Sequence, residues 1–177
     1  DGWLDLCAVG TKRDATEEGA VRLWRNPGGD SEVKDWPDIS QATGVASMTL
    51  PYVADIVAAD ADLDGDTDLL LITAGGPRFL RNEGGNVNGQ LKVRLVSSKT
   101  NPTGLGTHVE VREKDFWATR GVSELPIEIG VGKRERLDVV QTLWTNGVID
   151  NTLDVVVGRK PTTILEKNVA TGSCPFL

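Results

Sequence analysis

Short apolar runs separated by turns rich in glycine and proline dominate the hydropathy pattern of the chain. Apolar and polar residues alternate at 90–96 and 108–112, which is typical of half-buried strands. Residues 49–59 read as a buried strand. Further strands are expected at 69–73, 116–120, 124–129, 137–144, 151–157 and 163–167. No apolar pattern with helical spacing persists beyond a turn or two, so the chain is predicted to be all-β.

An acidic loop, Asp60 to Asp68, separates two of these strands. Aspartates alternate along it, and Gly65 stands at the sixth position, where the backbone must turn sharply. Hard cations such as Ca²⁺ prefer several converging oxygen ligands, and without a cation these carboxylates would repel each other. The expected ligands are the side chains of Asp60, Asp62, Asp64 and Asp68 and the backbone carbonyl of Asp66.

Two other interpretations of this loop have to be weighed. An EF-hand loop begins in the same way, but it needs a bidentate glutamate at position 12, where this chain has Leu71, and it needs flanking helices. The short, partly β-branched flanks favour strands on both sides instead. A solvated acidic turn without metal is the remaining alternative.

The start of the chain repeats part of this region. Residues 1–10 match 64–73, and residues 21–29 match 77–85, with a longer turn expected at 11–19 in the first copy. A repeat of about sixty residues built from short strands is typical of a β-propeller blade or another sheet array. The first copy has no counterparts of Asp60 and Asp62, so it cannot complete a cation site by itself. We expect an upstream part of a longer protein, or another chain, to complete it.

The acidic loop, the apolar run after it and the later Arg81-Asn82-x-Gly-Gly turn resemble FG-GAP and VCBS repeats. These repeats form the blades of integrin-α-type propellers and of many secreted bacterial proteins. The resemblance implies that the loop aspartates named above are calcium ligands. It also implies a partial propeller of one to two blades.

The second half of the chain is similar to the ASPIC and UnbV domain, which usually follows VCBS repeats. The similarity rests on the turns at 101–106, 129–132 and 143–147. Thr145 stands where that family usually has proline after the tryptophan. About seven strands in fewer than eighty residues, with Asn146-Gly147 as a hairpin turn, predict a small β-sandwich or barrel-like domain.

The predicted organisation therefore has three parts. Residues 1–89 form the repeat region, residues 90–168 form the second β domain, and residues 169–177 form a tail. Cys7 and Cys174 lie near opposite ends of the chain, so spacing alone leaves open both a long-range disulfide and a buried free thiol at Cys7.

Charge and composition limit the class of partner. A net charge of −7 argues against nucleic acid and anionic membrane surfaces. No apolar run has the length of a transmembrane helix. Because the chain opens at Asp1 without methionine, the absence of a targeting segment carries little information. The family resemblance implies an exported protein, extracellular or periplasmic, where calcium near millimolar levels fills weak sites.

No constellation of residues indicates catalysis. His108, the only histidine, stands at the start of an expected strand after a glycine turn, a position typical of a solvated or packed histidine. The glycine pairs at 104–106 and 130–132 lack a following helix and a Gly-Lys-Ser/Thr motif, so they are expected to be turns rather than phosphate loops. Glu17 and Glu18 are expected in a solvated loop. The chain is predicted not to be an enzyme.

The expected function is a calcium-stabilised module for adhesion or assembly, with a protein partner or the remainder of a longer chain. A glycan-binding module is an alternative, since a tryptophan can stack on a sugar. Most tryptophans lie in apolar patterns and are expected to be buried, Trp36 within or between blades. The five are Trp3, Trp24, Trp36, Trp117 and Trp144. An accessory subunit of a larger complex is a further alternative.

Overall fold

The computed structural model describes residues 2–12, 15–28, 35–123 and 125–167. Within them the chain is all-β, as predicted, with two single-turn 3₁₀ helices, η1 (Val45–Ser47) and η2 (Gly85–Val87). Neither helix is long and apolar enough to cross a membrane. Two compact units, Asp1–Asn88 and Gly89–Leu177, divide the chain. None of their sheets closes on itself.

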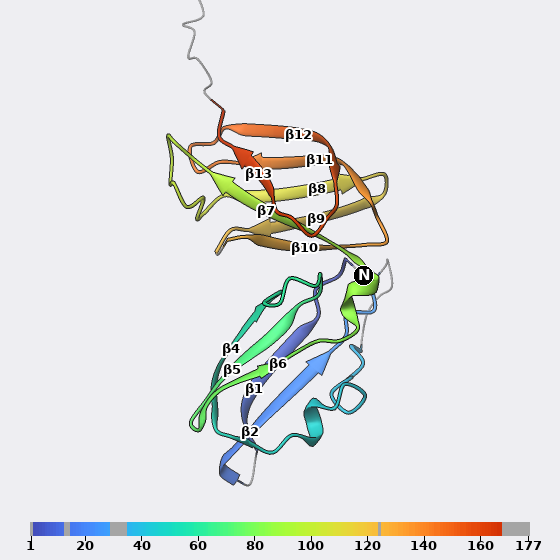
Figure 1. Cartoon of the computed structure of the whole chain (residues 1–177), viewed down its shortest axis with the longest axis vertical. Coiled ribbons are helices and arrows are strands. Elements are labelled where there is room, and N and C mark those ends of the chain that lie inside the picture. The colour runs from blue at the N-terminus through green and yellow to red at the C-terminus, as the bar shows by residue number, and fades with distance from the viewer. Residues whose placement is uncertain (1, 13–14, 29–34, 124, 168–177) are drawn as a thin grey trace, which may run out of the picture. The chain divides into compact units, whose positions relative to one another are not determined.

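The first unit contains two three-stranded antiparallel sheets (Figure 1). One has the order β1-β2-β3 and the other the order β4-β5-β6. Their strands are β1 (Leu6–Lys12), β2 (Ala15–Trp24), β3 (Leu50–Pro51), β4 (Val53–Ala59), β5 (Asp68–Thr73) and β6 (Gly76–Leu80). Both sheets contribute to a single small core, whose most buried members are Val21, Leu50, Val53 and Leu71. The core therefore lies between the two sheets.

Gly19 shows how closely these sheets approach each other. A Cβ atom built on Gly19 would lie 2.5 Å from Cγ2 of Val53 on β4 of the second sheet, and 2.2 Å from the carbonyl oxygen of Pro51 on the neighbouring strand β3. Only glycine fits such an approach, because any side chain would overlap the neighbouring backbone. A glycine on β2 thus lets the first strand of the second sheet pack against the first sheet.

The two predicted repeat copies form hairpins with the same register. Leu6 pairs with Trp24 and Cys7 with Leu23. At the matching positions of the second copy, Leu69 pairs with Leu80 and Leu70 with Phe79. The next two pairs of the first copy, Ala8–Arg22 and Val9–Val21, likewise match two pairs of the second, Leu71–Arg78 and Ile72–Pro77. The sequence repeat is therefore a structural repeat.

The second unit has two sheets around a larger core. Their orders are β10-β7-β13 and β12-β11-β8-β9, and β13 pairs with β7 in parallel. The strands are β7 (Gly89–Val96), β8 (His108–Glu113), β9 (Phe116–Gly121), β10 (Ile127–Gly132), β11 (Arg136–Leu143), β12 (Ile149–Val156) and β13 (Thr162–Leu165). Both sheets supply fully buried side chains, among them Val93, Ile129, Val111 and Val140. Two sheets with one core make a sandwich, and Figure 1 shows β7 and β13 lying over the other sheet.

The predicted hairpin turn at Asn146-Gly147 is confirmed. Gly147 has a φ of 82° and its N–H donates to the carbonyl of Trp144 at 2.9 Å. Asn146 Oδ1 accepts the N–H of Val148 at 3.0 Å, so the asparagine side chain closes the same turn. The two residues fit this turn because glycine tolerates a positive φ and asparagine bonds its own backbone two residues on.

Several local predictions are wrong. Residues 11–19 do not form a long turn: Thr11 pairs with Gly19, so Glu17 and Glu18 lie on β2. An antiparallel ladder uses backbone groups and needs no apolar side chains, which is why polar residues extend this hairpin. Gly130 and Gly132 belong to β10, whose register shifts between them, because glycine permits a bulge within a strand.

The predicted buried strand at 49–59 is also different in the structure. It divides into β3 and β4, which pair with different sheets. A register shift between Val53 and Asp55 puts Val53 and Ile56 on one face of β4 and Val57 on the other. Val53 is 2% exposed, whereas Val57 is 42% exposed. Only one face of β4 therefore meets the core.

The tryptophans are less buried than predicted. Trp144 is 1% exposed, but Trp3, Trp36 and Trp117 are 49%, 39% and 60% exposed. The apolar sequence pattern around them does not distinguish the inner face of a sheet from its outer face. Cys7 is a half-buried free thiol, and burial raises its pKa. Cys174 and the predicted tail lie outside the described residues.

Candidate metal centre

The acidic loop joins β4 to β5, as predicted. Ala59 and Asp68 face each other as the last pair of the β4–β5 ladder, so the loop begins and ends at one point. Within it, Leu63 has a φ of 62° and Gly65 a φ of 103°. The two left-handed residues fold the backbone back on itself. Leu63 is 65% exposed, and therefore no packing of its side chain explains this conformation.

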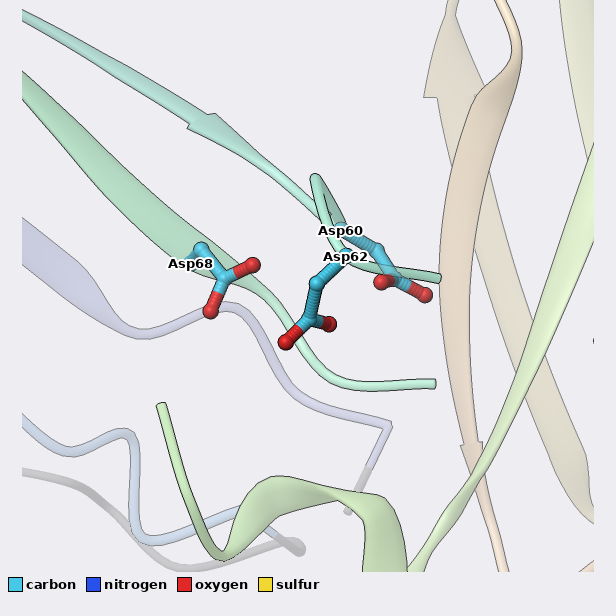
Figure 2. A group of neighbouring side chains, drawn as sticks. All are labelled: Asp60, Asp62 and Asp68. Carbon is cyan, nitrogen blue, oxygen red and sulfur yellow. The ribbon is translucent and has the colours of Figure 1, made fainter. Parts of the chain in front are cut away.

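Three carboxylates come together at the base of the loop. Asp60, Asp62 and Asp68 each offer an oxygen atom, and these atoms all lie within 4.8 Å of one another. Figure 2 shows Asp60 and Asp62 on the loop and Asp68 at the start of the neighbouring strand. Asp60 and Asp68 are buried, with 4% and 1% exposure. No other group of three or more His, Cys, Asp or Glu side chains meets in this way among the residues described.

Backbone N–H groups contact all three carboxylates, including Asp62, which accepts the N–H of Asp64 at 3.2 Å. Asp60 accepts hydrogen bonds from Asp64 at 3.1 Å and from Gly65 at 3.0 Å. Asp68 accepts from Ala61 at 3.1 Å and from Asn82 at 2.9 Å. These bonds fix the carboxylates before any ligand arrives. A site with ligands already in position loses less conformational entropy on binding.

Asp64 and Asp66 point to other partners. The Asp64 carboxylate accepts the N–H of Asp66 at 3.2 Å. The Asp66 carboxylate is buried and accepts the N–H of Gly85 at 3.0 Å, which ties the loop to the turn after β6. Neither carboxylate belongs to the group of three. The ligand roles assigned to Asp64 and to the Asp66 carbonyl stay predictions.

Arg81 is a part of the site that the sequence did not assign. Its Nε lies 2.7 Å from Asp62 Oδ2, and its Nη2 lies 3.6 Å from Asp64 Oδ2. Asp62 and then Glu83 raise the pKa of Arg81 by their charge. The guanidinium therefore neutralises part of the loop and competes with any cation for Asp62. The Arg-Asn pair at the same place in both copies, 25–26 and 81–82, was the signal in the sequence.

The first repeat copy shows the same framework without the carboxylate cluster. The N–H of Asn26 donates to Asp5 Oδ1 at 2.7 Å, and the Asn26 side chain donates to the carbonyl of Leu4 at 3.2 Å. In the second copy, Asn82 makes the matching bonds to Asp68 and to the carbonyl of Thr67, at 2.9 and 3.4 Å. This framework is thus a property of the repeat, and the cation cluster is an addition to it.

No family model matches the chain, and no curated protein is significantly similar to it.

An all-oxygen group of three carboxylates suits a hard divalent cation and offers nothing to a soft one. Three like charges at this distance, two of them buried, repel one another unless a positive charge lies between them. The donor set therefore fits a cation, and its geometry leaves the choice among hard cations open.

Proposed function

We propose that this protein is a non-enzymatic calcium-binding interaction module in which the ion stiffens the β4–β5 junction. The convergence of Asp60, Asp62 and Asp68 is the observation that carries the proposal. A cation held by two loop residues and one strand residue links three points of the backbone. A cation that binds only the folded state would stabilise the protein more as the cation concentration rises.

Calcium is the preferred cation for two reasons. It accepts six to eight oxygen ligands in flexible geometry, so backbone carbonyls and water can complete a set of three carboxylates. Magnesium demands a near-ideal octahedron and gives up its water reluctantly. A site of this kind is filled at the millimolar calcium of extracellular fluids, and we therefore propose an extracellular or periplasmic location. The resemblance to secreted FG-GAP and VCBS proteins supports this location.

The resemblance also supports a structural role for the repeats. Matching registers in the two copies are what successive blades of a propeller would show. We propose that β1-β2-β3 and β4-β5-β6 are two such blades and that the second unit is an ASPIC/UnbV-like domain. Partners would be proteins or further blades.

The test is a calcium titration by calorimetry combined with thermal melting in calcium and in chelator. We expect one site per chain, a melting temperature that rises with calcium, and a much weaker response to magnesium. Asp62→Asn should remove the calcium response, since it removes the charge of one ligand. Asp55→Asn is the control: Asp55 is an exposed residue on β4, outside the loop, and the substitution removes the same charge. A calcium concentration of 10 mM is about tenfold above the dissociation constants of weak extracellular calcium sites. Absence of both a binding heat and a melting shift up to this concentration would exclude the proposal.

Glycan binding is a second candidate because of Trp117. This side chain is 60% exposed on β9 and hydrogen-bonds to Glu110, which lowers the pKa of that carboxyl. An exposed indole fixed by a polar neighbour is a suitable surface for stacking on a sugar ring. Screening soluble glycans by tryptophan fluorescence, with Trp117→Ala as control, would test it. Equal responses of the two proteins would exclude this surface.

A further inference from the structure

The second sheet of the repeat unit leaves one apolar face exposed. Residues directly opposite each other in an antiparallel sheet lie on the same face. Val57 pairs with Leu70, and Leu70 pairs with Phe79, which places the three side chains in one row across β4, β5 and β6. Their exposed fractions are 42%, 36% and 50%, and Ile72 beside them is 40% exposed. We call these four residues the open face.

The repeat shows what such a face packs against. Cys7, Val9 and Leu23 of the first sheet correspond to Leu70, Ile72 and Phe79 of the open face, by sequence and by register. In the first sheet these side chains pack against the core that the second sheet completes. Equivalent residues are therefore partly buried against the core in one copy and exposed in the other.

The face of the second sheet that covers the first sheet also has a repeat equivalent, which lies in the first sheet. The second sheet covers the first with the face that carries Leu71 and Leu80. Their counterparts in the first sheet are Ala8 and Trp24, which share a face with Leu6, because Leu6 pairs with Trp24. Leu6 is 53% exposed, Ala8 is exposed and Trp24 is partly exposed. We call Leu6, Ala8 and Trp24 the outer face of the first sheet.

The chain thus carries a second, exposed set of the two hairpin surfaces, β1–β2 and β5–β6, that meet in its core. β4 adds Val53 and Ile56 to that core and has no repeat counterpart among the described strands. The open face lies on the side of the second sheet that points away from the core, and the outer face lies on the side of the first sheet that points away from it. We infer that the open face binds the outer face of β1-β2-β3 in a second copy of the chain, so that copies associate head to tail. Such a contact is heterologous, because the two surfaces differ. Heterologous contacts build rings or open chains rather than closed dimers.

Burial supplies the driving force for this contact. An apolar surface removed from water stabilises an interface in proportion to its area, and aromatic side chains such as Phe79 and Trp24 contribute most of it. Large apolar side chains gathered on one sheet face are typical of an interaction site. The packing inside the unit supplies the geometry for the two hairpins, because β5–β6 of one copy would meet β1–β2 of the next through repeat-equivalent side chains.

Sedimentation velocity of the full chain over a wide concentration range tests the inference. We expect the average mass to rise with concentration to at least twice the 19.0 kDa of one chain. Phe79→Asp and Leu6→Asp should each abolish this rise, because each places a charge in one half of the interface. Leu153→Asp, at a 67% exposed strand position in the other unit, should leave it unchanged.

Mixing the two variants gives the decisive result. Phe79→Asp retains an intact outer face, and Leu6→Asp retains an intact open face. Each variant alone should stay a monomer, whereas an equimolar mixture should form a dimer and nothing larger. A wild-type chain that is monomeric at every concentration would overturn the inference. So would a mixture that remains monomeric, or association that survives both substitutions. Far-ultraviolet circular dichroism and melting confirm that each variant is folded.

Discussion

Asp68 Oδ1 accepts the backbone N–H of Asn82 at 2.9 Å, and Asp5 does the same for Asn26 at 2.7 Å in the first repeat copy. Each bond joins the start of one strand to the end of the next. Only Asp68 also belongs to the carboxylate cluster. One aspartate thus braces a hairpin, and its repeat equivalent braces a hairpin and contributes to a candidate metal centre.

This pair separates bracing from metal binding. Asp68→Asn should lose the rise in melting temperature that calcium produces, because a ligand charge is gone. Asp5→Asn changes the same kind of hydrogen bond outside the cluster and should keep the full calcium response. In chelator, Asp5→Asn should cost about 1 kcal/mol of stability, the size of a typical hydrogen bond. Asp68→Asn should cost less, because it also relieves the repulsion within the carboxylate cluster. Equal calcium responses in both variants, measured by differential scanning calorimetry, would argue against Asp68 as a ligand.

Removal of Arg81 should strengthen cation binding. Its guanidinium lies 2.7 Å from Asp62 and competes for that carboxylate. We expect Arg81→Gln to raise calcium affinity about three- to tenfold, because it removes one competing charge near the protein surface. Arg78→Gln, on β6 and with the same charge change, should have a smaller effect. Calorimetric dissociation constants at fixed ionic strength decide the matter, and weaker binding in Arg81→Gln would show that Arg81 organises the site.

Gly19 should be intolerant of a side chain. A Cβ there meets the Pro51 carbonyl of β3 at 2.2 Å and Val53 Cγ2 of β4 at 2.5 Å, so Gly19→Ala must distort β3 and move the second sheet away. Overpacking of this kind costs about 1–3 kcal/mol. Gly10→Ala is the control, since nothing lies within 4 Å of its added Cβ. Urea denaturation should show a loss for Gly19→Ala and little change for Gly10→Ala. Similar stabilities would mean that the sheets can move apart freely.

Glu166 should make the second unit sensitive to acid. Its carboxylate accepts the N–H groups of Lys99 and Thr100 at 3.2 and 3.1 Å and the side chain of Asn146 at 2.9 Å. Burial opposes ionisation, but hydrogen bonds from Ser97, Thr100 and Lys99 outweigh it and lower the pKa. A lowered pKa means stability that is present above the unfolded value of about 4.3 and is lost as the pH falls through the folded value.

Glu166→Gln should therefore destabilise the protein by about 2 kcal/mol at pH 7, because donors that faced a charge now meet an amide. The deficit should shrink below about pH 4, where the wild-type carboxyl is itself protonated. Exposed Glu135→Gln serves as the control and should match the wild type throughout. Denaturation curves between pH 3 and pH 7 give the comparison. A deficit that does not depend on pH would contradict the role of the charge.

The candidate site was predictable because its parts are close in sequence. Asp60, Asp62 and Asp68 fall within nine residues, and a loop between paired strands brings its two ends together. Arg81 was not assigned, because its contact with Asp62 depends on how β6 pairs with β5. Periodicity predicted the strands of the second unit for a similar local reason. It could not predict that polar residues would continue β2 through Glu17 and Glu18.

The sequence by itself determined the all-β class, the acidic loop and the repeat, since alternation, turn residues and spacing are local properties of a chain. Only the tertiary structure decided which face of each strand is covered. Trp117 and Phe79 lie in apolar patterns yet are 60% and 50% exposed, whereas Trp144 is buried. Burial depends on which sheet packs against which. That choice is made by contacts between residues far apart in the chain, and a single strand does not encode it.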